Sequence, residues 1–161
     1  MDEQPTNLKQ QIQEQERRLQ FDRFTNDDAW RLGCLLVELA REGGLGVTID
    51  IRRSGQQLFH SALPGTTPDN DSWIARKARV VERYGVSSFQ VGQHYRDKGT
   101  TFSEGTPHLD QAEYAAHGGG FPIRVRDVGV VGAVVVSGLP EAEDHALVVK
   151  ALELFLSENS E

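Results

Sequence analysis

Residues 121–137, FPIRVRDVGVVGAVVVS, decide the fold of this chain. Two runs rich in β-branched residues predict strands over 121–126 and 128–137, joined by a tight turn at Arg126 and Asp127. The second run is dominated by valine, which is typical of a central strand that is buried on both faces. The stretch therefore predicts a hairpin at the centre of an antiparallel sheet.

Helices and a second hairpin precede this stretch, and one helix follows it. Residues 47–51 and 57–63 predict two short strands, with Ser54 and Gly55 as the turn between them. Capping residues, prolines and terminal glycines predict the helices. These run from Thr25 or Asn26 to Gly43, from Thr67 to Gly85, from Ser87 to about residue 98, over a short segment at 110–116, and from Pro140 to about Leu156. The order of elements predicts the α+β class, with helices packed on the faces of the sheet.

The N-terminal segment differs from the rest of the chain. Residues 4–20 are rich in Gln, Glu and Arg, and only Leu8, Ile12 and Leu19 form an apolar helical stripe. So narrow a stripe does not hold a helix without tertiary contacts. We therefore predict a helical arm over residues 1–22, packed on the body or on a neighbouring subunit, and a single domain over residues 23–161.

Composition excludes several classes of protein. The formal net charge of −7 argues against a nucleic-acid binder, which needs a basic face. Cys34 is the one cysteine, which excludes an intramolecular disulfide and a zinc site made of cysteines alone. The chain has no run of about 18 apolar residues, and its N-terminus lacks the pattern of a secretory signal. We expect a cytoplasmic protein that binds neither nucleic acid nor membrane.

Two long blocks resemble known families. Residues 117–152 read HGGGFPIRVRDVGVVGAVVVSGLPEAEDHALVVKAL. Their glycine-rich start, the hairpin that ends in GAVVVSG and the acidic helix start resemble the haem-degrading-domain (GlcG/HbpS-like) family. Residues 50–88 read DIRRSGQQLFHSALPGTTPDNDSWIARKARVVERYGVSS. They are similar to an uncharacterised branch of that family with the hallmark FHxxLPGTTPDNxxWIxRK.

The resemblance carries expectations about fold, partners and cofactor. It implies a profilin-like fold, in which α-β-α layers surround a central antiparallel sheet. It also implies a symmetric homo-oligomer, either a dimer or a larger ring. Some members of the wider family bind haem or assist its breakdown, so haem is the cofactor that the resemblance suggests. For this branch it implies no particular reaction.

The histidines are the candidate iron ligands. None of the five has the H-x-x-x-H or HExxH spacing of a dedicated zinc site, so we predict no such metal site. His117 directly precedes a glycine run, where a backbone without side chains lets a ligand approach closely. His145 lies in the first turns of the last helix, whose dipole favours a neutral imidazole, although Glu143 and Asp144 act in the opposite direction.

The helix that carries Trp73 also carries two neighbouring cations. Arg76 and Lys77 flank Trp73 and are suited to bind carboxylates, such as haem propionates or a small organic acid. Lys77 falls inside the apolar stripe, so its ammonium group must reach solvent or find an acidic partner. The plainer interpretation is that Arg76, Arg79 and Arg83 form a solvated face that pairs with acids.

Three hypotheses remain open from the sequence. The first is an oligomeric binding module for haem or another anionic small molecule. Its candidate ligand-binding residues are His60, Trp73, Arg76, Lys77, His117, Gly118, Gly119 and Phe121. The second is a non-catalytic scaffold that acts through its symmetric oligomer. The third, an enzyme acting on a small organic acid or a haem-derived substrate with His60 or His117 as acid–base group, ranks last because no nucleophile–base pair is evident.

Overall fold

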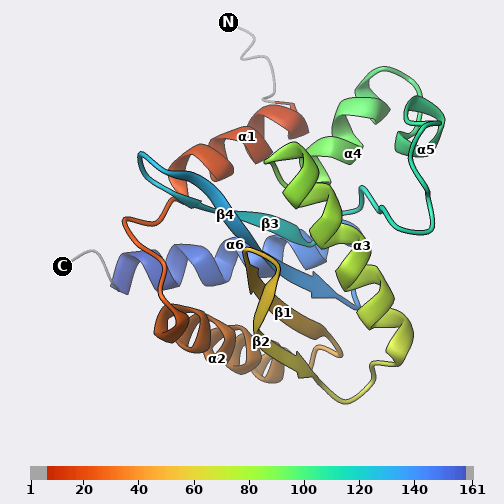
Figure 1. The fold of residues 1–161 in the computed structure, drawn as a ribbon. Coiled ribbons are helices and arrows are strands. Elements are labelled where there is room, and N and C mark those ends of the chain that lie inside the picture. Colours follow the sequence, from red (N-terminus) through yellow and green to blue (C-terminus); the bar gives the residue numbers. More distant parts are fainter. Residues whose placement is uncertain (1–6, 159–161) are drawn as a thin grey trace, which may run out of the picture.

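The computed structural model describes residues 7–158 as a four-stranded antiparallel sheet between layers of helices (Figure 1). The strand order is β2-β1-β4-β3. The strands are β1 (Thr48–Arg53), β2 (Gln56–Ala62), β3 (Gly120–Val125) and β4 (Gly129–Ser137). The helices are α1 (Leu8–Arg18), α2 (Asn26–Glu42), α3 (Pro68–Tyr84), α4 (Ser88–Asp97), α5 (Phe102–Gly105) and α6 (Glu141–Glu158). The predicted α+β class and the layered α-β-α arrangement are both confirmed.

The valine-rich strand β4 is central, as the sequence predicts. It pairs with β1 on one side and with β3 on the other. Val134 and Val136 belong to the large core that α2 and α6 cover, whereas Ala133 and Val135 pack against α3. Because successive side chains of a strand point to opposite faces, one valine run supplies both halves of the core.

Local capping explains where the helices begin and end. Thr25 and Asp28 form a reciprocal capping box at the start of α2, and the side chain of Ser87 accepts a hydrogen bond from the Gln90 amide at the start of α4. Gly85 ends α3 with a φ of 70°, in the left-handed region that favours glycine. These boundaries lie within one or two residues of those predicted from the sequence.

The helix predicted over residues 110–116 is wrong. This segment forms turns instead, and the short helix lies earlier, at α5. Side chains of α3 explain the difference, because Arg76 donates to the carbonyl oxygens of Gln111 and Tyr114 and Arg79 donates to that of Glu113. Carbonyl groups that are bound by arginines in this way do not need to accept the hydrogen bonds of a helix. Arg76 and Arg79 therefore contact a loop instead of pairing with acids, while Arg79 stays exposed, as the solvated face predicts.

The N-terminal segment is tied to the body at two places. α1 lies against α4, and its Ile12 side chain is buried. After α1, Phe21 donates its amide to the Arg124 carbonyl and accepts from the Arg126 amide, so that the segment runs along the open edge of β3. Leu19 and Phe21 enter the main core. These contacts place the linker between α1 and α2 beside the β3–β4 turn.

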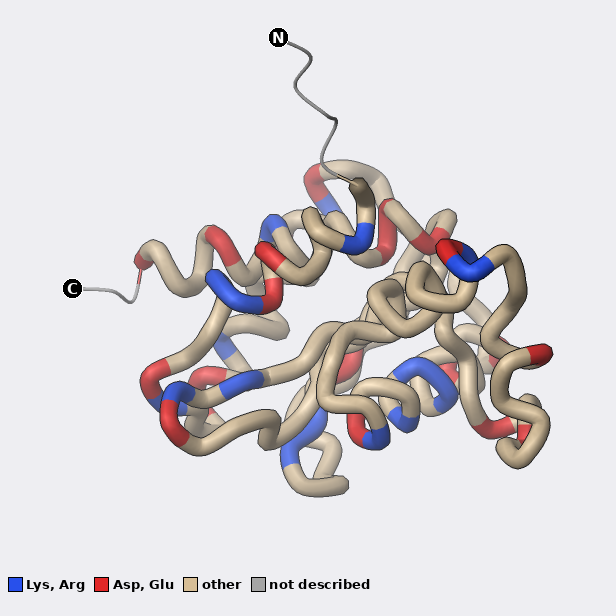
Figure 2. Tube along the Cα trace, turned by 90° about the horizontal axis from the view of Figure 1, so that it is seen from above, with Lys and Arg blue, Asp and Glu red and all other residues tan. Residues whose placement is uncertain are grey.

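The described residues also show how charged and apolar side chains are distributed over the helices. Basic and acidic residues are interspersed along the helices in the view of Figure 2. None of the helices between residues 7 and 158 has the length and apolarity that crossing a bilayer requires. The cytoplasmic location stays a prediction.

Candidate functional site

His117 lies between the start of β3 and the start of α6, and its ring is held on two sides. Its Nδ1 lies 3.2 Å from Oε2 of Glu141, the first residue of α6. The Trp73 ring of α3 meets it edge to face, with 5.3 Å between the ring centroids. The hydrogen bond with His117 is the main cause that lowers the pKa of Glu141, and it outweighs the opposing effect of burial. The imidazole therefore has a fixed orientation beside an ionised carboxylate.

A cavity of about 290 Å³ lies on one side of His117. It is formed by the first turns of α3, the end of β4 and the first turn of α6. Its lining residues are Asp69, Asn70, Trp73, Lys77, His117, Ser137, Gly138, Leu139, Glu141 and Asp144. Three of these are carboxylates, so this cavity does not favour an anion.

Lys77 forms the floor of this first cavity as half of a buried ion pair. Its side chain is only 4% exposed, and its Nζ lies 3.1 Å from Oδ2 of Asp144 and 3.0 Å from the carbonyl oxygen of Val136. Burial lowers the pKa of Lys77 and raises that of Asp144, while the attraction between the two charges opposes both changes. The acidic partner that the apolar position of Lys77 requires is therefore Asp144.

The glycines after His117 allow the protein's own atoms, including the Lys77 ammonium group, to pack closely against the backbone. A Cβ atom on Gly119 would lie 2.7 Å from the Lys77 Nζ and 2.3 Å from the Val136 oxygen, and its φ of 132° is one that other residues rarely adopt. A Cβ atom on Gly118 would lie 2.2 Å from the carbonyl oxygen of Glu141. The close approach predicted for these glycines is therefore made by the protein's own atoms.

A second cavity, of about 410 Å³, lies on the other side of His117, among α3, α4, α5 and residues 111–117. Arg76 and Arg96 line it, and no Asp or Glu of the described chain does. The Arg76 guanidinium already makes two kinds of contact. Its Nη2 donates to carbonyl oxygens of the loop, and its central carbon lies 4.5 Å from the centre of the Trp73 ring. Its Nε is buried and has no hydrogen-bond partner within residues 7–158. This cavity is therefore basic.

The structure places His60 and Phe121 away from the other sequence candidates. Those that it brings together are Trp73, Arg76, Lys77, His117, Gly118 and Gly119. His60 lies on β2, outside both cavities, with Nδ1 2.9 Å from buried Asp50 and Nε2 3.0 Å from Asp71. Phe121 is 1% exposed and belongs to the main core, where it helps to enclose His145. His60 and Phe121 therefore line neither of the cavities beside His117.

Two residues of the site were not among the sequence candidates. Glu141 orients His117, and Arg96 lies 3.4 Å from Glu141 as well as lining the second cavity. Glu141 could be recognised in the sequence only as an acidic residue in the first turn of a helix. Arg96 gives no signal beyond its position near the end of a short helix.

The comparisons with known proteins agree with this fold. The model of the family described as "Haem degrading protein HbpS-like" matches residues 24–153. A UPF0303 protein of Streptomyces coelicolor is 68% identical over 148 residues, which are 92% of this chain and 93% of that protein. A UPF0303 protein of Rhizobium etli is 49% identical over 92% of this chain and 89% of its own.

Solved structures extend the comparison. The crystal structure of Ybr137w protein has a TM-score of 0.86 and 34% identity, covering 95% of this chain and 90% of its own. The structure described as a PduOC:heme complex has a TM-score of 0.68 and 19% identity, and the match covers 81% of this chain and 93% of that chain. The structure of HbpS has a TM-score of 0.65 and 18% identity, and the match covers 85% of this chain and 92% of that chain. The two more distant likenesses show the shared fold. From the family model and the close relatives, the chain belongs to the HbpS-like haem-degrading family and groups within it with the UPF0303 proteins.

Proposed function

We propose that this protein is a small-molecule-binding domain that holds haem, or another anionic ligand, at His117. The observation that carries the proposal is the contact between His117 Nδ1 and Glu141. When a carboxylate accepts from the Nδ1–H of a histidine, the other ring nitrogen, Nε2, is the one directed at a metal. Within residues 7–158, that Nε2 has no hydrogen-bond partner.

The groups around His117 also suit the anionic part of haem. Arg76 and Arg96 are the cations that line the second cavity, and guanidinium groups bind carboxylates such as the haem propionates. Bound haem would supply an iron centre for ligand or redox chemistry. His117 would hold it, Glu141 would orient His117, and Trp73 would cover one side of the imidazole ring. The haem complex of the PduO neighbour supports the same ligand class.

A haemin titration tests this proposal. We expect a saturable, stoichiometric Soret change for the unaltered protein and a loss of at least about tenfold in affinity for His117→Ala. Glu141→Gln should weaken binding by about 10–100-fold, as is typical when the orienting partner of a metal-binding histidine is removed. His60→Ala and His108→Ala are the matched controls and should bind as the unaltered protein does. Absorbance that rises linearly, without saturation, in all variants contradicts the proposal.

We also propose that the chain forms a symmetric homo-oligomer, the basis of the scaffold hypothesis. The outer edge of β2 pairs with nothing within residues 7–158, and the strand carries no Lys, Arg, Asp or Glu. Trp30 on the adjacent α2 is 63% exposed and contacts Phe59 of β2. Uncharged open edges and exposed tryptophans are features that monomeric proteins avoid, because both favour association.

The oligomer is tested by sedimentation or light scattering on a Trp30→Ser variant. We expect its subunits to dissociate at a concentration at least about tenfold higher than those of the unaltered protein, because a buried tryptophan at an interface contributes about 2 kcal/mol or more. Val128→Ser removes another exposed apolar side chain, away from β2, and should leave the assembly unchanged. A monomeric unaltered protein, or equal effects of both variants, contradicts this assignment.

A further inference from the structure

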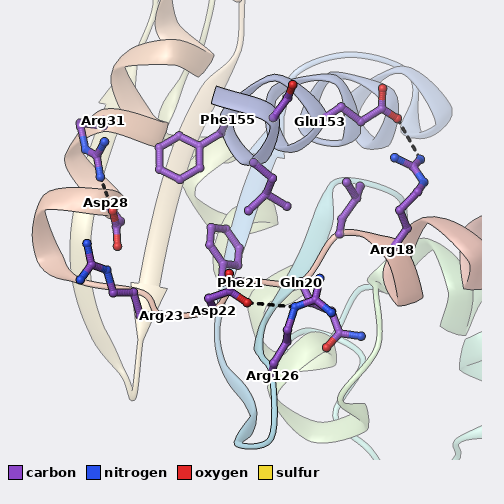
Figure 3. Close-up of a pocket in the computed structure, with 13 residues that line it drawn as sticks. Arg18, Gln20, Phe21, Asp22, Arg23, Asp28, Arg31, Arg126, Glu153 and Phe155 are labelled. Atoms are coloured by element: carbon purple, nitrogen blue, oxygen red, sulfur yellow. Dashed lines mark hydrogen bonds and ion pairs between the residues drawn. The ribbon is translucent and has the colours of Figure 1, made fainter. Parts of the chain in front are cut away.

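A third cavity, of about 630 Å³, lies at the opposite end of α6 from Glu141 and shares no residue with the two cavities beside His117. Four arginines line it: Arg18, Arg23, Arg31 and Arg126. They come from the end of α1, the α1–α2 linker, α2 and the β3–β4 turn. Figure 3 shows them arranged around Phe21 and Phe155. Such a concentration of guanidinium groups is unexpected in a chain with a net charge of −7.

The backbone fixes this arrangement. The hydrogen bonds of Phe21 with the backbone of Arg124 and Arg126 hold the linker along β3. The Phe21 ring is thereby buried against Phe24 and Phe155, and the next two linker residues, Asp22 and Arg23, are left exposed beside the β3–β4 turn. The floor of the cavity is therefore rigid and apolar, while its charged groups sit on the rim.

Three of the arginines have acidic partners, and two of these pairs are exposed enough to be exchanged for a ligand. Arg126 pairs with Asp22, whose side chain is 89% exposed, and Arg18 pairs with the half-exposed Glu153. Ion pairs this exposed contribute little to stability. Arg31 pairs with Asp28, but Asp28 also accepts from the Thr25 amide and keeps that bond without the arginine.

The fourth arginine is available already. Arg23 has neither an ion-pair partner nor a hydrogen-bond partner among residues 7–158. It lies on the same linker as Asp22, and its side chain points toward the side of the cavity where Asp28 and Arg31 lie (Figure 3). A bound anion would therefore meet one free guanidinium at once and recruit Arg18 and Arg126 from their exposed, weak pairs.

We propose that this cavity binds a small polyanion, a molecule that carries at least two phosphate or carboxylate groups. Each guanidinium offers a planar fork of donors that matches either group, and four forks around one cavity match a ligand with several anionic groups better than a single ion. The volume lies in the range of ordinary small-molecule sites. The site is separate from His117, so that haem and the polyanion do not compete for the same side chains.

Calorimetric titrations at low ionic strength with inorganic tripolyphosphate and with citrate test the proposal and separate phosphate from carboxylate ligands. We expect saturable binding of at least one of the two. Arg23→Gln/Arg126→Gln should weaken it by about tenfold or more, because charge-assisted contacts are lost. Asp22→Asn should strengthen it a few-fold, because Arg126 is then released from its partner.

The matched control is Arg17→Gln/Arg41→Gln, which removes the same charge from exposed positions of α1 and α2 outside the cavity lining. It should change the affinity by less than about twofold. Equal losses in the two double variants would identify the binding as a general charge effect and overturn the proposal. The absence of saturable binding of both probes would overturn it as well. All the altered side chains are exposed, so the variants are expected to fold.

Discussion

Lys77→Met is expected to lower the free energy of unfolding by about 3–5 kcal/mol, the usual cost of removing one partner of a buried ion pair. The substituted side chain nearly fills the same volume, so the loss comes mainly from Asp144, whose buried carboxylate keeps only its backbone donors, such as the Leu139 amide at 3.0 Å. Chemical denaturation followed by circular dichroism measures the loss. Lys150→Met, on the exposed side of α6, should change stability by less than about 0.5 kcal/mol.

The pH dependence identifies the cause of this loss. Burial raises the pKa of Asp144, and the raise becomes larger when Lys77 no longer opposes it. When the pKa of a carboxyl group is higher in the folded protein than in the unfolded one, protonation favours the folded state. This stabilisation is complete below the unfolded pKa and is lost as the pH rises through the folded pKa. The loss of unfolding free energy in Lys77→Met should therefore become smaller toward low pH. The double variant Lys77→Met/Asp144→Leu should recover most of the lost stability. A deficit that stays constant with pH and is unchanged in the double variant points to packing alone.

The sequence predicted those features that depend on neighbouring residues. The ends of α2, α3 and α4 follow from caps and glycines within a few residues of each boundary, and the position of β4 follows from its run of valines. The need of Lys77 for an acid could also be predicted, because its place in an apolar stripe is a local property. That the acid is Asp144, 67 residues away, depends on how α3 and α6 meet across β4.

The candidate site was predicted less well, because it depends on contacts between distant segments. The sequence groups His60 with His117 as a candidate ligand-binding residue, but in the structure it bridges Asp50 and Asp71. The failure at residues 110–116 has the same origin, since arginines of α3 bind the carbonyl groups of that segment. The sequence left the charge of His145 open, because the helix dipole and the neighbouring acids act in opposite directions. In the structure neither decides it, since burial lowers its pKa to about 4.

The docking of α1 creates a second titrating carboxyl group. Glu16 is buried between α1 and the start of α4, where its two oxygens accept from the amide and the hydroxyl of Ser87 at 2.8 and 2.9 Å. Burial raises the pKa of Glu16 to about 7, against the opposing effects of the Ser87 hydrogen bonds and of Arg124. Two histidines also face α1: the Nε2 of His145 lies 2.7 Å from Gln15, and the Nδ1 of His94 lies 2.9 Å from the Nζ of Lys9.

Glu16→Gln is therefore expected to remove a pH dependence of about 3 kcal/mol from the stability of the protein. A folded pKa above the unfolded value means that Glu16 stabilises fully below its ordinary pKa of 4.5, and that this stabilisation is lost as the pH rises through about 7. Relative to the unaltered protein, Glu16→Gln should gain stability between pH 5 and pH 9. The change in His145 runs the other way and cancels in the difference between the two proteins. Denaturation midpoints measured across this range, with exposed Glu14→Gln as the control, check the result, and a difference that does not change with pH contradicts it.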